Sequence, residues 1–525
     1  MKKTISLVVF NESSIIDWSL GSKYSLEYTT KSLNNNRQEI LKENPDYILF
    51  WDAKNKLPSK EVLEKVYKTK GNLWHVGTKI GLNNYPNLLE DIQPTSMLHV
   101  DVNEEINQCS WKNSFKGSLL EKRVFEEIEL TNYSNCLDIT GLDFGYKAMK
   151  SGVITRYSSL LSESIVSVSI KLSKLDELLF IRNNFDTKAF FWCYITNFFR
   201  ISPFSFLEAS KRKRKAQLNV FNHTVSNNIL ENKDTSVAIV IATLDRYSFL
   251  KDELKEIRLL KLQPKEIIII DQTVKERRDK TFLKSFEDLP IKYIEADIIG
   301  QCTARNKGIE VAKSKFIWFL DDDMKEIPSD YLSRHLETLY GLNVDVSCGI
   351  PDEMGTDFMD RSIPKIEISD GLPVGDTLIK KSLLDKVKGF DIKMDQLQSE
   401  DQEMGLRLLK KGALIVKNNQ LRIVHLRAPR GGLRNHNVRK ITFASSRKSI
   451  WVRRFLHYSE IYLNLKHFSK KQIQKSLLLN IRGTFIVRGS ILKKLIKFLF
   501  AILVLPQTLY IISRNFKIAK KLLAK

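Results

Sequence analysis

The chain has 525 residues, too many for a single hydrophobic core, and this length predicts two to four structural units at roughly 100 to 200 residues per domain. Its 84 Lys and Arg residues against 61 Asp and Glu residues give a net charge of +23, which favours an anionic partner such as phospholipid, nucleic acid or a phosphorylated substrate. The five cysteines form no CxxC pair and have no His at ligand spacing, so neither a zinc site nor a disulfide framework is indicated. A reducing cytoplasm fits this pattern best.

The N-terminal part begins with an apolar run at 5–10, which is too short for a signal peptide and is predicted to be a first strand. Two later segments of this part recur in the second half with the same order and similar spacing. They are YILFWDAKNKLPS at 47–59, which matches FIWFLDDDMKEIPS at 316–329, and GLDFGYKAMKSG at 141–152, which matches DQEMGLRLLKKG at 401–412. We therefore expect residues 1–185 to be a shortened copy of the fold of the second half, with chance similarity between two α/β segments as the alternative.

Residues 186–232 are predicted to connect the two copies. Phe and Trp are frequent at 189–206, and KRKRK follows at 211–215. This combination indicates an amphipathic, basic segment.

From residue 237 the sequence alternates apolar, β-branched runs with amphipathic segments. VAIVIA at 237–242, EIIIID at 266–271 and FIWFL at 316–320 have the continuous apolar character of strands that are buried on both faces. The segments between them carry apolar residues at helical spacing. The pattern predicts an α/β domain over 233–440, and sheets of this kind bind ligands at the carboxyl ends of their strands.

Residues 441–525 show no strand alternation and are predicted to be basic helices. The apolar stretch at 498–513 is about 16 residues long and contains Pro506, so it is short of the roughly 20 residues that span a bilayer. Lys and Arg residues flank it on both sides. A helix lying on an anionic membrane surface is therefore expected.

Three aspartates, Asp321, Asp322 and Asp323, directly follow the strand predicted at 316–320. Carboxylates crowded at one sheet edge repel each other unless a cation compensates. Oxygen ligands suit Mg²⁺ or Mn²⁺, which proteins usually hold with one or two carboxylates together with substrate phosphates. A solvated acidic turn is the alternative.

Two upstream features suit a nucleotide diphosphate. GQCTARN at 300–306 opens a predicted helix, where backbone N–H groups and the cation of Arg305 can bind an anion, although an ordinary helix start has the same appearance. Asp271 ends the EIIII strand and can accept hydrogen bonds from a nucleoside, or else is an ordinary turn residue.

Downstream, Glu400 and Asp401 lie at the start of a predicted helix. A carboxylate placed there can act as a general base toward an acceptor hydroxyl, but acids also cap helices. His425 can serve as a metal ligand or phosphate contact, although a lone His is usually structural. Arg434 and two neighbouring arginines surround a Gly-Gly pair, and they either bind a diphosphate or form a solvated basic loop.

Taken in order, VAIVIATLDR, EIIIIDQT, GQCTARNKG, FIWFLDDDM, GDTLIKKSLLDKVKGFD and SEDQEMGLRLLKKG resemble the family 2 glycosyltransferases of GT-A fold over about 200 residues. The resemblance implies an inverting transfer of sugar from a nucleotide diphosphate sugar to a hydroxyl acceptor, with Mg²⁺ or Mn²⁺ bridging the diphosphate. Together with the internal repeat and the basic C-terminal helices, it predicts for the whole chain an α/β fold with two tandem GT-A (Rossmann-like) copies and a helical C-terminal tail.

The same matching implies a role for each motif residue. Asp323 falls at the metal ligand, Asp321 and Asp322 lie near the sugar nucleotide, and Asp401 falls at the general base with Glu400 beside it. The nucleotide-binding positions are Thr243, Asp245, Asp271 and Arg305. The chain departs from the family pattern after Asp271, where Gln272 and Thr273 replace a small acidic and glycine pair, and in having no multi-span membrane channel.

The first copy lacks these chemical groups. Alignment of the repeats places Asp52 on Asp321, but Ala53 and Lys54 fall on Asp322 and Asp323, and Thr140 and Gly141 fall on Glu400 and Asp401. Asp143, Lys147 and Gly152 keep the places of Glu403, Arg407 and Gly412. The first copy is therefore predicted to retain its scaffold and to lack catalysis.

The family resemblance and the basic tail predict a cytoplasmic enzyme, peripheral at the inner face of the cell membrane. Its expected acceptor is a glycan or lipid-linked glycan in the synthesis of a cell-surface polysaccharide or lipopolysaccharide. A nucleic-acid-binding protein is a rival that the net charge prompts, but the acidic clusters at 321–323 and 400–401 disfavour it, and no nucleic acid is expected as a partner. A non-catalytic scaffold is disfavoured because the metal and base positions of the second half are intact.

Overall fold

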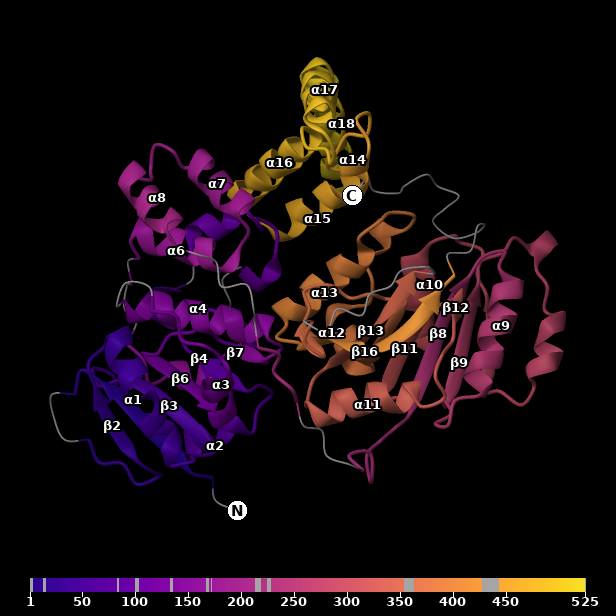
Figure 1. Cartoon of the computed structure of the whole chain (residues 1–525). Coiled ribbons are helices and arrows are strands. Elements are labelled where there is room, and N and C mark those ends of the chain that lie inside the picture. The colour runs from indigo at the N-terminus through magenta and orange to yellow at the C-terminus, as the bar shows by residue number, and fades with distance from the viewer. Residues whose placement is uncertain are drawn as a thin grey trace.

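The computed structural model describes residues 3–12, 16–82, 85–99, 103–132, 136–166, 170, 172–212, 219–223, 228–353, 363–426 and 443–524. Two α/β units lie side by side, and the C-terminal helices lie above the junction between them (Figure 1). The mixed α/β fold and the helical tail predicted from the sequence are confirmed.

The first α/β unit has a sheet with the strand order β2-β1-β3-β6-β4-β7-β5 among its described residues. Its central strands are buried along their length, as expected for strands with helices on both faces. Its elements are β1 (Ile5–Phe10), β2 (Lys23–Leu26), α1 (Thr30–Lys42), β3 (Tyr47–Asp52), α2 (Lys60–Tyr67), β4 (Leu73–His75), β5 (Gln108–Cys109), β6 (Gly117–Glu121), α3 (Lys122–Glu127), α4 (Leu137–Lys150), β7 (Thr155–Tyr157) and α5 (Ser159–Ser162).

The second α/β unit has the strand order β10-β9-β8-β11-β15-β13-β16-β12, and β14 pairs with β16. The strands predicted at 237–242, 266–271 and 316–320 are confirmed as the parallel neighbours β8, β9 and β11. The elements are β8 (Val237–Thr243), α9 (Tyr247–Arg258), β9 (Glu266–Asp271), β10 (Ile291–Glu295), α10 (Gln301–Val311), β11 (Phe316–Asp321), β12 (Met324–Lys325), α11 (Tyr331–Gly341), β13 (Val346–Glu353), β14 (Ile366–Ile368), β15 (Asp376–Lys380), α12 (Lys381–Val387), α13 (Glu400–Lys410) and β16 (Ile415–His425).

The two sheets share a common path of strands. β2-β1-β3-β6-β4-β7-β5 of the first corresponds to β9-β8-β11-β15-β13-β16-β14 of the second, with the same parallel or antiparallel relation at every step. The register also agrees: when Tyr47 is set against Phe316, each residue pair between β3 and β6 has its counterpart between β11 and β15. Strand β10 and helix α9 have no counterpart among the described residues of the first unit.

The second repeated segment forms α4 in the first unit and α13 in the second. Each helix carries a buried carboxylate paired with a cation one turn later, Asp143 with Lys147 and Glu403 with Arg407, both at 2.8 Å. The scaffold positions that the sequence repeat singled out therefore make equivalent contacts.

The two units meet through equivalent surfaces, with α13 against β5 and α4 against β14. Gly152 and Gly412, which follow α4 and α13, both have positive φ (98° and 80°) and face the other unit. A Cβ on Gly152 would lie 2.6 Å from the carbonyl oxygen of Ile366, and one on Gly412 would lie 2.8 Å from that of Asn107, the counterpart of Ile366. Only glycine fits such an approach. Because equivalent residues make this contact from both units, the interface has approximate two-fold symmetry.

Direct bonds also join the two units. The Gln108 amide donates to the carbonyl oxygens of Leu409 and Lys410 at 3.3 and 3.2 Å. The Arg156 guanidinium donates to the carbonyl oxygen of Gly412 at 3.0 Å. These bonds hold the C-terminal end of α13 against the first unit.

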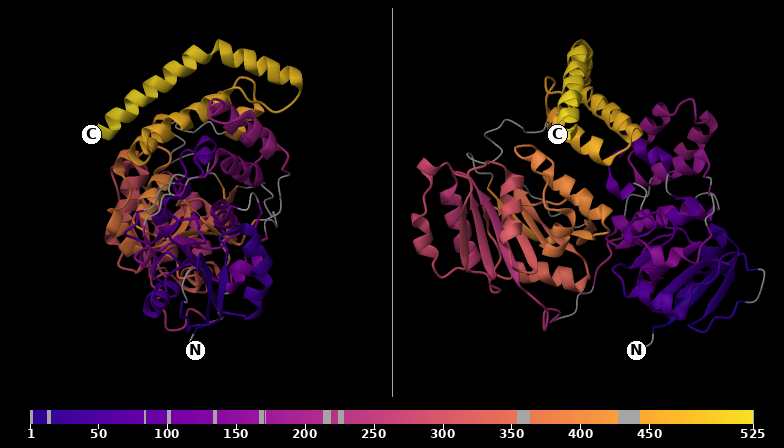
Figure 2. Two further views of the ribbon diagram at one scale, coloured as in Figure 1. Left: turned by 90° about the vertical axis from the view of Figure 1, so that its left-hand side faces the viewer. Right: turned by 180° about the vertical axis from the view of Figure 1, so that it is seen from behind.

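Eight further α-helices are described outside the two α/β units, and six short 3-10 or π-helices lie within the loops. Helices α6 (Lys174–Asn184), α7 (Thr187–Thr196) and α8 (Pro203–Ser210) follow the first unit, and the last two lie in the predicted connector. The C-terminal helices are α14 (Phe443–Lys448), α15 (Tyr458–His467), α16 (Lys470–Thr484), α17 (Ile491–Leu503) and α18 (Leu505–Ala524). Figure 2 shows α17 and α18 as the outermost layer on this side of the molecule.

The apolar stretch predicted at 498–513 is divided between α17 and α18, which meet at an angle of 59°. By length and composition, the described part of the chain has no single helix suited to crossing a bilayer, whereas this bent pair passes the same criteria when its two helices are taken together. Many apolar side chains of α17 face outward, among them Leu492 (66% exposed) and Leu503 (79% exposed).

Candidate active site

The carboxyl ends of β8, β9 and β11 bring Thr243, Asp271 and the acidic triplet to one edge of the second sheet, because these strands are parallel neighbours. The Thr243 hydroxyl donates to Asp322 at 2.7 Å, which links the ends of β8 and β11 directly.

The acidic triplet is partly neutralised by an arginine. Asp322 and Asp323 are buried, and Arg246 Nη1 lies 2.7 Å from Asp322 Oδ1 and 3.6 Å from Asp323 Oδ2. Burial raises the pKa of Asp322 to about 6, while Arg246 and Thr243 act in the opposite direction. The sequence analysis missed Arg246, which directly follows the VAIVIATLD run.

His425 lies beside Asp323, with 3.1 Å between Nε2 and Asp323 Oδ1. Pairing of β12 with β16 sets Met324 opposite His425 and so brings these two side chains together across about a hundred residues of sequence. The carboxylate of Asp323 and the imidazole of His425 are suited to be two ligands of one divalent cation. Carboxylate oxygens favour Mg²⁺ or Mn²⁺. Within the described residues, no group of three or more His, Cys, Asp or Glu side chains is placed to hold a metal ion.

Arg305 joins the acidic triplet to the helix that carries the candidate base. Its Nη2 lies 3.1 Å from Asp321 Oδ1, and its Nη1 lies 3.2 Å from Glu400 Oε1. Burial and the neighbouring charge of Asp401 raise the pKa of Glu400 to about 7, and Arg305 offsets this only in part. Asp401 follows in the first turn of α13, where its Oδ1 accepts a hydrogen bond from the Gln402 backbone N–H at 2.7 Å.

The two aspartates predicted to bind the nucleotide already have protein partners. Asp271 accepts hydrogen bonds from the Thr273 backbone N–H and from the hydroxyls of Tyr247 and Tyr293. Asp245 pairs with Arg277 at 2.6 Å. Asp271 is fully buried under these partners, whereas Asp245 is exposed. Arg434 and its neighbouring arginines lie outside the described residues.

One expectation at the start of α10 is wrong. The backbone N–H groups of Cys302 and Thr303, expected to be open to an anion, donate instead to Asp395 at 2.7 and 3.1 Å. A carboxylate at a helix N-terminus satisfies these donors and the helix dipole, and Asp395 does so from a segment more than ninety residues away. Arg305, which lies beyond the first turn of α10, is the part of that motif that faces the site.

Comparison with known families decides the nature of the second unit. Residues 238–391 match the model of the family described as "Glycosyl transferase family 2". The second unit is a family 2 glycosyltransferase domain. The matched part of the glycosyltransferase domain contains Thr243, Arg305 and the acidic triplet, but it ends before Glu400, Asp401 and His425. The roles of these last three rest on their position in the fold.

Several solved structures are similar in part. TarS 1–349 from S. aureus in complex with UDP-GlcNAc is 14% identical, with a TM-score of 0.35 over 48% of this chain and 72% of that chain. The mannosyltransferase PcManGT from Pyrobaculum calidifontis, in complex with GDP-Man and Mn²⁺, is 12% identical, with a TM-score of 0.34 over 54% and 85%. For another crystal structure of S. aureus TarS 1–349, the similarity spans 60% of that chain. A search of curated proteins finds no significant match.

Two glutamates on α13 are expected to respond to substitution with opposite signs. The folded state raises the pKa of Glu400 to about 7, so the Glu400 carboxylate costs stability as pH rises toward that value. Glu400→Gln should therefore unfold at a higher temperature than the parent chain at pH 8.5, and the difference should be smaller at pH 5.5.

Glu403→Gln is the matched control on the same helix. Burial alone raises the pKa of Glu403, but hydrogen bonds from His467 and Arg407 outweigh it and lower the pKa to about 2. Its carboxylate stabilises the fold at every pH above the unfolded value, so this variant should be less stable at both pH values. Thermal unfolding that moved in the same direction for both variants at pH 8.5 would contradict the assignment.

Proposed function

We propose that the chain transfers a sugar from a nucleotide diphosphate sugar to a hydroxyl of a glycan or lipid-linked glycan, with inversion at the transferred carbon. The proposal is supported by one arrangement above all: Arg305 contacts both Asp321, at the end of β11, and Glu400, at the start of α13. The acids that suit the donor and the acids that suit the acceptor therefore face one site of a glycosyltransferase domain.

In the proposed reaction, Asp323 and His425 would hold Mg²⁺ or Mn²⁺ beside the donor diphosphate. The bound cation supplies charge neutralisation to the departing nucleotide diphosphate. Thr243, Asp245, Asp271 and Arg305 face the nucleotide.

Asp401 accepts the proton of the acceptor hydroxyl as its oxygen bonds to the sugar carbon. The bond from that carbon to the diphosphate oxygen breaks on the opposite side, and the nucleotide diphosphate leaves with the electron pair. Attack opposite to the leaving group gives inversion.

Two variants of the full chain distinguish the proposed role of the metal ligand from that of the base. Asp323→Ala should lose Mn²⁺-dependent release of nucleotide diphosphate by about 10² to 10³-fold and should lose the thermal stabilisation that Mn²⁺ with nucleotide sugar gives the parent. Asp401→Asn should lose about 10² to 10⁴-fold in turnover but keep that stabilisation. A panel of UDP-, GDP- and dTDP-sugars serves as donors. Undiminished turnover by Asp323→Ala in excess chelator would refute the metal role.

We further propose that residues 1–185 form a degenerate copy of the glycosyltransferase domain. Support comes from the shared strand path and register and from the residues at the chemical positions. Thr140, which aligns with Glu400, is fully buried and contacts the Thr30 hydroxyl at 2.9 Å, so that position is closed. Lys54, which aligns with the metal ligand Asp323, is exposed and cationic.

Aligned aspartates in the two copies provide the test. Asp52→Asn in the full chain should leave transfer within about twofold of the parent, whereas Asp321→Asn should reduce it at least tenfold, because only Asp321 lies beside the donor and Arg305. Both variants are checked for the parent's melting temperature. Loss of transfer in Asp52→Asn with normal folding would give the first copy a chemical role.

We propose that the protein is cytoplasmic and attaches to the inner face of the cell membrane through α17 and α18, in the synthesis of a cell-surface polysaccharide or lipopolysaccharide. The outward apolar side chains of α17 lie next to Lys493 and Lys494, which suits an interfacial helix on anionic lipid.

Membrane fractions test this attachment. High salt or alkaline carbonate should release most of the protein, and Leu492→Glu with Leu503→Glu should leave it in the soluble fraction without treatment. Retention of the parent chain through both washes would show integral insertion instead.

A further inference from the structure

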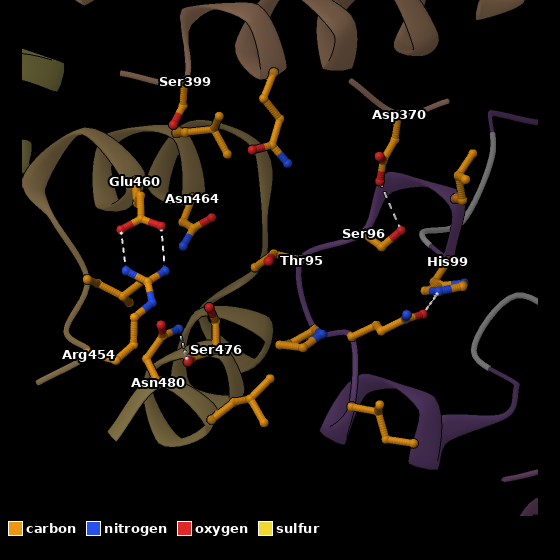
Figure 3. A pocket seen from close by; sticks show the side chains of 18 of the residues that line it. Thr95, Ser96, His99, Asp370, Ser399, Arg454, Glu460, Asn464, Ser476 and Asn480 are labelled. Carbon is orange, nitrogen blue, oxygen red and sulfur yellow. Dashed lines mark hydrogen bonds and ion pairs between the residues drawn. The ribbon is translucent and has the colours of Figure 1, made fainter. Parts of the chain in front are cut away.

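A cavity of about 450 Å³ with mixed polar and apolar walls lies where the two α/β units and the C-terminal helices meet (Figure 3). Residues 92–99 and α4 line it from the first unit, Asp370, Ser399 and Gln402 line it from the second, and α15 and α16 close it. Its volume is within the range of small-molecule sites. Apart from Asp370, these walls lie outside the part of the chain that matches the glycosyltransferase family.

Two buried polar atoms in the cavity wall lack a hydrogen-bond partner among the described residues: Ser399 Oγ and Asn480 Oδ1. Ser399 is 7% exposed and Asn480 is 5% exposed. Buried polar atoms are nearly always bonded, so two unsatisfied atoms in the walls of one cavity point to a partner that the described residues do not supply. Figure 3 shows the two side chains on opposite walls of the cavity.

Ser399 is held in an unusual backbone conformation. It precedes α13, where serine normally caps the helix with its hydroxyl, yet its φ is 79° and its side chain makes no capping bond. A left-handed conformation is strained for a serine, and such strain is concentrated at functional sites. Here the strain accompanies a hydroxyl that lines the cavity.

The cavity has balanced charge. Lys150 and Arg454 are the cations of its lining, and Asp370 and Glu460 are the carboxylates. Arg454 lies 2.8 Å from Glu460, and Ser96 donates to Asp370 at 3.0 Å. His99 is uncharged, because burial and the nearby charges of Lys112 and Lys150 lower its pKa to about 3. A site for phosphate would present cations in excess, so these walls suit a neutral ligand that donates and accepts many hydrogen bonds.

The cavity adjoins the candidate base. Successive residues of an α-helix are about 100° apart around the axis. Glu400 faces Arg305, whereas Gln402 lines the cavity, so Asp401 projects between the donor side and the cavity side of α13.

We infer that this cavity binds a neutral sugar unit of the acceptor, and that the first unit and the C-terminal helices serve as the acceptor-binding wall. The inference rests on the proposed function and assigns its acceptor subsite. The ligand class is a saccharide without phosphate or carboxylate. Ser399 and Asn480 supply hydrogen bonds to its hydroxyl groups.

The test uses the full chain and a fixed panel of free sugars: glucose, galactose, mannose, rhamnose, N-acetylglucosamine, N-acetylgalactosamine and their β-linked disaccharides, with glycerol phosphate as the anionic competitor. Binding is followed by saturation-transfer NMR. Asn480→Leu should weaken binding of the preferred sugar at least tenfold, and Ser399→Ala, which removes a single oxygen, should weaken it about fivefold. Gln474→Leu, on the exposed side of α16, should bind like the parent.

The preferred sugar should also accelerate nucleotide diphosphate release by the parent chain and not by Asn480→Leu. Three results would overturn the inference: no sugar of the panel binds, Asn480→Leu and Ser399→Ala with the parent's melting temperature both bind as the parent does, or glycerol phosphate competes best. Binding without acceleration would overturn the acceptor assignment. Mn²⁺-dependent donor hydrolysis by the parent reports separately on the proposed function.

Discussion

The buried guanidinium of Arg305 is the contact on which the candidate site depends. It lies between Asp321 and Glu400, two carboxylates that come from a strand end and a helix start far apart in sequence. The Asp321 side chain is 36% exposed and that of Glu400 is 11% exposed. Without a cation between them, the Glu400 carboxylate would carry an uncompensated cost of desolvation and would face a second negative charge. Arg246 acts in the same way for Asp322 and Asp323. The site is therefore assembled by arginine–carboxylate pairs, and its acids are held in place before any ligand arrives.

Sequence patterns predicted the parts of the site that depend on local order. The buried strands β8, β9 and β11 are continuous β-branched runs, and their ends carry the acids that the motifs indicated. The short antiparallel strands β14 and β15 were not predicted, because three to five residues with polar ends carry no clear period. Arg246 was missed because its value depends on the adjacency of β8 and β11, which bring it to Asp322 across 76 positions.

At the start of α10, the sequence predicted an anion site that the structure does not have. A helix N-terminus that looks open in sequence is closed in the structure by Asp395, and no local pattern announces a cap that arrives from 92 or 93 positions away. The internal repeat was easier to detect, since the Asp143–Lys147 and Glu403–Arg407 pairs each lie within one helical turn. The matching strand path could not be read from sequence, because register between strands is a long-range property.

The two-fold relation between the units has a consequence for how the molecule can change over time. Equivalent surfaces that face each other, with Gly152 on Ile366 and Gly412 on Asn107, are what two identical subunits would use to dimerise. In a dimer of separate chains, every substitution appears twice, once in each subunit. When both units belong to one chain, a substitution can change one unit without changing the other, and the covalent link keeps the two units at a one-to-one ratio. Each unit can then acquire its own surface residues. The two units become different from each other while the interface between them keeps its approximate two-fold symmetry.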